Sequence, residues 1–155
     1  MTTPPLRKAA RVIALDDDHR VLLLHYDEGG SFWATPGGSL ETGEDYDAAA
    51  LRELHEELGV DEKDVALSGQ LAERSQDHAV GGREVRQIER YFLAHLSPGD
   101  LDPARATQPD NIRAHRWWTL QELRSTRETV YPLGLSDLIT DVLTAGVPEY
   151  PVVLH

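Results

Sequence analysis

Two apolar runs near the start of the chain predict a β-hairpin. Residues 9–15 and 21–26 are rich in leucine and β-branched side chains, a composition typical of strands. The polar stretch between them, 16–20, reads DDDHR and has the composition of a turn. It lacks the glycine and the later bidentate glutamate that a calcium loop requires, so we interpret it as a solvated turn.

Further strands follow from the same pattern of β-branched and aromatic residues. Residues 32–35 form a short strand that ends at the Pro36-Gly37-Gly38 segment, because glycine and proline interrupt regular structure. Other predicted strands cover 65–71, 85–96 and 113–118, with a turn over 78–83 and a surface loop over 97–111.

Helical spacing of leucines predicts a helix over 46–58. At about 100° per residue, Leu51, Leu54 and Leu58 fall on one side of this segment. Asp45 can cap its start, and Gly59 can end it in the left-handed conformation. A capping box at 119–122 opens a second, short helix; a third covers 133–143, and the tail 148–155 is loosely held. Because the elements alternate without βαβ regularity, we expect a mixed sheet with helices on both sides.

The other side of the 46–58 helix carries unusual charge. Arg52, Glu53, Glu56 and Glu57 lie within an arc of roughly 140°. Like charges four residues apart, as in Glu53 and Glu57, destabilise a helix by about 0.2–0.5 kcal/mol. A bound cation would turn this repulsion into affinity. The alternative is an exposed, salt-bridged face on which Arg52 pairs with Glu56.

The length and composition of the chain limit its domain number, its metal chemistry and its association with membranes. A chain of 155 residues suits a single domain over 1–155. It contains no cysteine, which excludes disulfides and zinc-thiolate sites and leaves oxygen or imidazole to hold any metal. No apolar run approaches the roughly 20 residues of a membrane span, and the first residues lack the apolar core of a signal peptide. We therefore expect a soluble, cytoplasmic protein with no membrane partner.

The charge of the chain bears on its partners. A formal net charge of -12 argues against long nucleic acid, because affinity for a polyphosphate backbone depends on lysine and arginine. A small phosphate ester is still compatible, since a divalent cation inverts the local field among carboxylates.

The segment 38–60 resembles the Nudix box, G-x5-E-x7-R-E-U-x-E-E-x-G-U, in which U is a bulky aliphatic residue. Every defined position matches: Gly38, Glu44, Arg52, Glu53, Leu54, Glu56, Glu57, Gly59 and Val60. At an average usage of about 5–7% per residue type, chance agreement is on the order of one in a billion per starting point.

This resemblance implies a Nudix fold, an α/β/α sandwich with a mixed sheet, whose box binds Mg²⁺ or Mn²⁺. The usual reaction is hydrolysis of a nucleoside diphosphate linked to another group. Hydrolysis of a pyrophosphate needs an activated water and neutralised charge, and a divalent metal supplies both. A module that keeps the box but senses nucleotides without hydrolysis is the alternative, because fold does not fix function.

The resemblance also implies roles for the box residues. Glu56 and Glu57 are expected metal ligands, with the main-chain carbonyl of Gly38 as a further one. Glu53 is either a ligand or the general base.

Arg52 is expected to orient Glu53, and Glu44 to support the box through hydrogen bonds or a metal-bound water. Many family members use another acid outside the box; Glu89 is the preferred candidate and Asp110 the other, against the alternative that each is a surface acid. The histidines form no metal-ligand spacing.

Substrate contacts are predicted more loosely. The basic residues near the expected strands and the facing loop are Arg7, Lys8, Arg11, Arg83, Arg86 and Arg90; Arg11 and Arg83 are the ones we select for the phosphates. A base could stack on Trp33, Tyr26 or Trp117, although tryptophans are often core residues. Signatures of family subgroups are mostly missing, which mildly favours nucleoside triphosphates or oxidised nucleotides. Nucleotide sugars and capped or dinucleoside polyphosphates stay open, as do monomer and homodimer.

Overall fold

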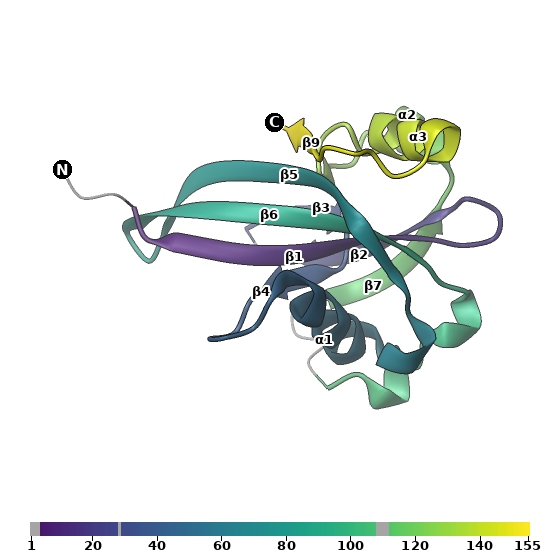
Figure 1. Cartoon of the computed structure of the whole chain (residues 1–155), viewed down its shortest axis with the longest axis horizontal. Coiled ribbons are helices and arrows are strands. Elements are labelled where there is room, and N and C mark those ends of the chain that lie inside the picture. The colour runs from purple at the N-terminus through teal and green to yellow at the C-terminus, as the bar shows by residue number, and fades with distance from the viewer. Residues whose placement is uncertain (1–3, 28, 108–111) are drawn as a thin grey trace.

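The computed structural model describes residues 4–27, 29–107 and 112–155 and arranges them around one mixed sheet (Figure 1). Its strands are β1 Leu6–Leu15, β2 Val21–Asp27, β3 Ser31–Ala34, β4 Gly37–Ser39, β5 Leu67–Val80, β6 Arg83–His95, β7 Ile112–Trp118, β8 Val130–Tyr131 and β9 Val152–Leu154. Its helices are α1 Tyr46–Leu58, α2 Leu120–Ser125 and α3 Leu135–Ala145, with 3-10 turns η1 Glu62–Asp64, η2 Pro98–Asp100 and η3 Pro103–Arg105.

The sheet combines parallel and antiparallel pairs. Its order is β8-β3-β2-β1-β6-β5-β9, with β4 paired to β1 and β7 paired to β2. β1 runs parallel to β6 along its whole length, whereas β1 with β2 and β5 with β6 are antiparallel. The predicted first hairpin and the mixed sheet are therefore both present.

Helices cover both faces of this sheet. In Figure 1, α1 lies on one side and α2 and α3 lie on the other. Alternate residues of a strand point to opposite faces, so Val12 packs toward α1 while its neighbour Ile13 packs toward α3. This arrangement confirms the predicted α/β/α sandwich.

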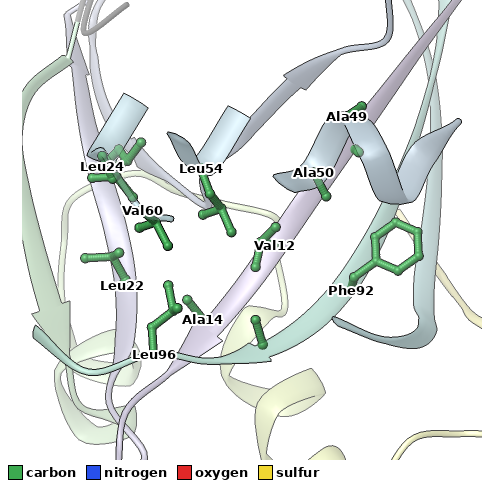
Figure 2. Close-up of a cluster of buried hydrophobic side chains, with 13 residues drawn as sticks. Val12, Ala14, Leu22, Leu24, Ala49, Ala50, Leu54, Val60, Phe92 and Leu96 are labelled. Atoms are coloured by element: carbon green, nitrogen blue, oxygen red, sulfur yellow. The ribbon is translucent and has the colours of Figure 1, made fainter. Parts of the chain in front are cut away.

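The core under α1 is made by small and branched side chains (Figure 2). It comprises Ala10, Val12, Ala14, Leu22, Leu24, Ala49, Ala50, Leu54, Leu58, Val60, Phe92, Ala94 and Leu96. Ala49 and Ala50 of α1 and Ala10 and Ala14 of β1 are all 0% exposed and add little bulk between the helix and the strand. The opposite core is centred on α3 and includes Leu138, Ile139 and Trp118.

The helix α1 has the predicted bounds because its ends are well specified. Asp45 Oδ1 accepts a 2.8 Å hydrogen bond from the Ala48 N–H at the start. At the end, Gly59 adopts φ 68°, a conformation that favours glycine. A Cβ there would also lie 1.9 Å from the carbonyl oxygen of Asp102, so glycine lets the loop after β6 pack against the helix terminus.

The chain differs from the sequence prediction mainly in the polar hairpin. The strand expected over 65–71 continues to Val80, and the turn expected over 78–83 is confined to Gly81 and Gly82, which both have positive φ. Residues 72–80 are polar and resemble a loop in composition, but pairing with β6 keeps them extended. β propensity depends strongly on such context.

The tail also differs. Residues 148–155 were expected to be loosely held, yet β9 pairs in parallel with Ala72, Glu73 and Arg74 of β5. The described part of the predicted 97–111 loop contains η2 and η3. None of the helices in the described ranges is long and apolar enough to cross a lipid bilayer.

Replacing Leu54 should test the core that fixes α1 to the sheet. Leu54 is 1% exposed, so Leu54→Ala should lower the free energy of unfolding by about 2–5 kcal/mol. Leu143→Ala is a matched control, because Leu143 also lies on a helix but is 39% exposed; it should cost about 1 kcal/mol or less. Chemical denaturation measures both, and equal losses would contradict this account of the core.

Candidate active site

Backbone glycines allow the acidic face of α1 to approach β4. A Cβ on Gly38 would lie 2.5 Å from Glu53 Oε1, so any larger residue here would push this carboxylate out of its position. Gly37 has φ 146°, and a Cβ there would lie 2.1 Å from the carbonyl oxygen of Ala10. The two glycines therefore bring main chain, rather than side chains, to the box acids.

Arg52 links most of these acids. Its Nε and Nη2 donate to the two oxygens of Glu44, at 2.8 and 2.9 Å. Its Nη1 donates to Glu53 Oε1 at 3.1 Å and to Glu56 Oε2 at 2.9 Å, and Nη2 also reaches the carbonyl oxygen of Ser39. These hydrogen bonds hold the pKa of Glu44 below its ordinary value. Arg52 thus joins the loop before α1 to the helix face.

Glu57 has separate partners. The Tyr26 hydroxyl donates to its Oε2 at 2.9 Å, and the Gly37 N–H donates to its Oε1 at 2.9 Å. Burial raises the pKa of Glu57 to about 7, and the nearby charge of Glu53 adds to the increase. Tyr26, which we considered as a stacking surface for a base, is instead committed to Glu57 and stacks on Phe32.

The pKa of Glu53 is also raised, first by burial and then by the charge of Glu56, while Arg52 opposes the shift. Glu53 and Glu56 are each only 15% exposed in their side chains. Partly buried carboxylates that repel one another favour a neutralising cation.

The chemistry of these donors suits a divalent metal. Carboxylate oxygens of Glu53, Glu56 and Glu57 and the carbonyl of Gly38 are all hard ligands of the kind that Mg²⁺ and Mn²⁺ prefer. In the part of the chain that the structure describes, however, no three acidic or imidazole side chains already surround one point. Arg52, Tyr26 and the backbone hold them instead, so a metal would have to reorganise these contacts.

A cleft of about 640 Å³ adjoins the box through β4. β1 and β6 form its floor, β5 forms one wall, and β3 and β8 form the other. Its lining is Arg7, Ala9, Arg11, Phe32, Ala34, Thr35, Gly38, Ser39, Arg74, Gln76, His78, Gln87, Glu89, Tyr91, Tyr131 and Leu133. Gly38 and Ser39 belong to both features, so a molecule in the cleft reaches the box.

Of the three residues predicted to contact substrate, one lines the cleft and two do not. Arg11 lines the cleft and donates from Nη1 to the carbonyl oxygen of Gly37 at 3.2 Å. Arg83 is exposed at the start of β6 and is not part of the lining. Trp33 is 8% exposed in the α3-side core, where its Nε1 donates to Glu128.

Of the two acids predicted outside the box, the structure describes only Glu89. Glu89 is 5% exposed and lies on the cleft floor between two arginines. Asp110 lies outside the described residues. Among the other basic candidates Arg7 lines the cleft, whereas Arg90 lies over the ring of Tyr46.

Several cleft residues were missed from the sequence. Arg74, Gln76 and His78 alternate along β5 and all line the cleft. The predicted strand ended at residue 71 and the predicted turn began at His78, so this alternation was not assigned to a strand. The aromatic wall of Phe32 and Tyr131 could not be inferred, because it depends on β3 pairing with the distant β8.

Known proteins match this chain over most of its length. Residues 5–135 match a family model described as the NUDIX domain. An RNA pyrophosphohydrolase from Sphingopyxis alaskensis is 31% identical over 128 residues, which cover 77% of this chain and 81% of that protein.

Solved structures share the fold. A Caenorhabditis elegans Ap4A hydrolase in a binary complex is 20% identical with a TM-score of 0.66, covering 89% of this chain and 96% of that one. A bifunctional NMN adenylyltransferase/ADP ribose pyrophosphatase from Francisella tularensis, complexed with AMP and a Mn ion, is 22% identical with a TM-score of 0.65. The match covers 93% of this chain and 43% of that one.

The raised pKa of Glu57 predicts a pH-dependent stability in metal-free buffer. The folded state holds a proton on Glu57 up to about pH 7, whereas the unfolded chain releases it near 4.3. Between these values the folded state binds more protons, so stability falls as pH rises. Glu57→Gln removes this loss, and its free energy of unfolding relative to wild type should grow by about 2 kcal/mol from pH 5 to pH 8.

Urea denaturation at both pH values measures this difference. Glu62→Gln is the control, because Glu62 is an exposed residue of η1. This substitution should change the free energy of unfolding by the same amount at both pH values. The same result for Glu57→Gln would refute the burial argument.

Proposed function

Because the chain belongs to the Nudix hydrolase family, we propose that it hydrolyses a pyrophosphate bond in a nucleoside diphosphate linked to another group, with Mg²⁺ or Mn²⁺ at the box. One observation carries the proposal: the box acids and a basic, aromatic cleft meet at Gly38. A nucleotide needs both, since its phosphates are anionic and its base stacks on aromatic rings.

Glu56, Glu57 and the Gly38 carbonyl would hold the ion, with Glu53 either as a further ligand or as the general base. When bound, the ion neutralises phosphate charge and lowers the pKa of water. The manganese in the similar Francisella tularensis protein supports this choice of metal.

The residues of the chain divide the remaining work. Arg52 keeps Glu53 and Glu56 at fixed positions through its Nη1. As the general base, Glu53 would accept the proton of the attacking water, and the burial that raises its pKa makes it a stronger base. Tyr26 orients Glu57 through its hydroxyl. Arg11 contributes a positive charge beside the reacting phosphates.

Several substrate classes belong in a first panel. The relatives named RNA pyrophosphohydrolase suggest the 5′ end of an RNA, and the neighbours named Ap4A hydrolase suggest dinucleoside polyphosphates. The net charge of -12 disfavours contact with a long nucleic-acid backbone, so we keep nucleoside triphosphates and oxidised nucleotides as the first choice.

A panel assay should reveal turnover that requires Mg²⁺ or Mn²⁺ and stops in chelator. The panel contains ATP, 8-oxo-dGTP, Ap4A, ADP-ribose and a short 5′-triphosphorylated RNA, with phosphate products measured. Glu53→Gln should lower kcat by about 10²- to 10⁴-fold while its circular dichroism stays unchanged. Glu62→Gln, on an exposed 3-10 turn, should behave as wild type. Nucleotide binding without turnover would instead identify a sensing module.

Metal affinity should depend on pH. Protons and metal compete for Glu57, whose pKa is raised by burial to about 7, so Mn²⁺ should bind more weakly as pH falls from 8 to 6. Electron paramagnetic resonance of free Mn²⁺ measures the affinity. Glu57→Gln should bind Mn²⁺ weakly at all these values, with Glu62→Gln as control. An affinity independent of pH would remove Glu57 from the ligand set.

A further inference from the structure

Glu89 lies between two arginines on the floor of the cleft. Its Oε2 accepts from Arg11 Nε at 2.8 Å, and its Oε1 accepts from Arg74 Nη1 at 3.1 Å. Its side chain is 7% exposed, while those of Arg11 and Arg74 are 21% and 14% exposed. Both carboxylate oxygens are therefore used by guanidinium groups, which ties Glu89 to the arginines rather than to the box.

This group of three leaves an excess of positive charge. Two guanidinium groups share one carboxylate, and Arg7 adds another positive charge to the lining. Glu89 is the sole acid among the described residues that line the cleft. In a chain with a formal net charge of -12, such a local reversal favours an anionic ligand.

The arginines also keep unused hydrogen-bond donors. Arg74 Nε is buried and finds no acceptor among the described residues. A buried donor without an acceptor is destabilising, and a guanidinium group has five N–H donors. Because Arg74 Nε is buried, phosphate oxygens in the cleft would accept instead from the Nη groups of the two arginines, whose fork matches the spacing of phosphate oxygens.

Contacts connect the two arginines both with the box and with the aromatic residues. Arg11 Nη1 bonds to the carbonyl of Gly37, next to Gly38 and the box. On the other side of Glu89, the Cζ of Arg74 lies 5.9 Å from the centroid of the Tyr131 ring. Tyr131 packs edge-on against Phe32 with centroids 5.6 Å apart. Phe32 in turn stacks on Tyr26, which bonds to Glu57 of the box, so the two arginines and the aromatic rings all border the cleft close to the box.

We propose that Arg11 and Arg74, held at a fixed spacing by Glu89, bind the substrate phosphates that lie beyond the box, and that Tyr131 and Phe32 receive the base. The inference rests on the proposed function and deepens it. It selects nucleotides that present several phosphates and a base to the cleft beside the box. Glu89 is then a positioning residue that acts through the two arginines.

Ligand binding in the absence of metal tests the proposed phosphate and base sites independently of hydrolysis. Isothermal titration calorimetry in EDTA should show that both inorganic tripolyphosphate and ATP bind to the wild-type protein. Arg74→Met should raise both Kd values by about tenfold or more, since hydrogen bonds to charged groups are strong. Arg86→Met is the matched control, because Arg86 lies on β6, pairs with Asp77 and is not part of the lining.

The two probes separate phosphate binding from base binding. Tyr131→Leu should weaken ATP but leave tripolyphosphate unchanged, because only ATP carries a base. Equal tripolyphosphate affinity in wild type and Arg74→Met, or no binding to wild type, would overturn the proposal that Arg11 and Arg74 bind phosphates. These results stand whether or not any nucleotide is hydrolysed.

Glu89→Gln tests the positioning role on a substrate that is turned over. The amide leaves one arginine without its carboxylate acceptor, so KM should rise about tenfold while kcat and Mn²⁺ affinity stay within about twofold of wild type. A fall in kcat of about 100-fold with unchanged KM, or a loss of Mn²⁺ affinity, would place Glu89 at the metal and overturn the role. If this variant does not fold, the result for Arg74→Met decides.

Discussion

The organisation of this protein depends on the contact of one guanidinium group with three carboxylates. Arg52 bonds to Glu44, Glu53 and Glu56, and also to the backbone of β4. Without it, the acids on α1 would repel one another and Glu44 in the preceding loop would lose its hydrogen bonds to the helix face. The apolar side of α1 fixes the helix to the sheet, and Arg52 then fixes the position of each acid on the other side.

Local signals in the sequence were sufficient for the central part of the fold. The bounds of α1 follow from Asp45, the leucine spacing and Gly59, all of which act within a few residues. The family resemblance rested on the same segment, and the match over 5–135 confirms it. The box acids were identified for the same reason, although their roles in binding metal stay predictions.

Features that depend on distant pairing were not accessible from the sequence. The polar part of β5 is extended because β6 pairs with it, and β9 is a strand because β5 offers a free edge. The partners of Glu89 come from residues 78 and 15 positions away, so its place between two arginines could not be inferred. Trp33 has the aromatic surface that a base needs, but the sheet turns it into the core.

The side walls of the cleft and the box come from different parts of the chain, and this separation has an evolutionary consequence. The box is contained in β4, α1 and the loop between them, whereas the side walls of the cleft come from β3, β5 and β8. Substitutions in those walls can therefore accumulate without disturbing the arrangement around Arg52. A lineage built on this architecture can acquire a new substrate preference by drift in a few wall residues while it retains its ancestral chemistry.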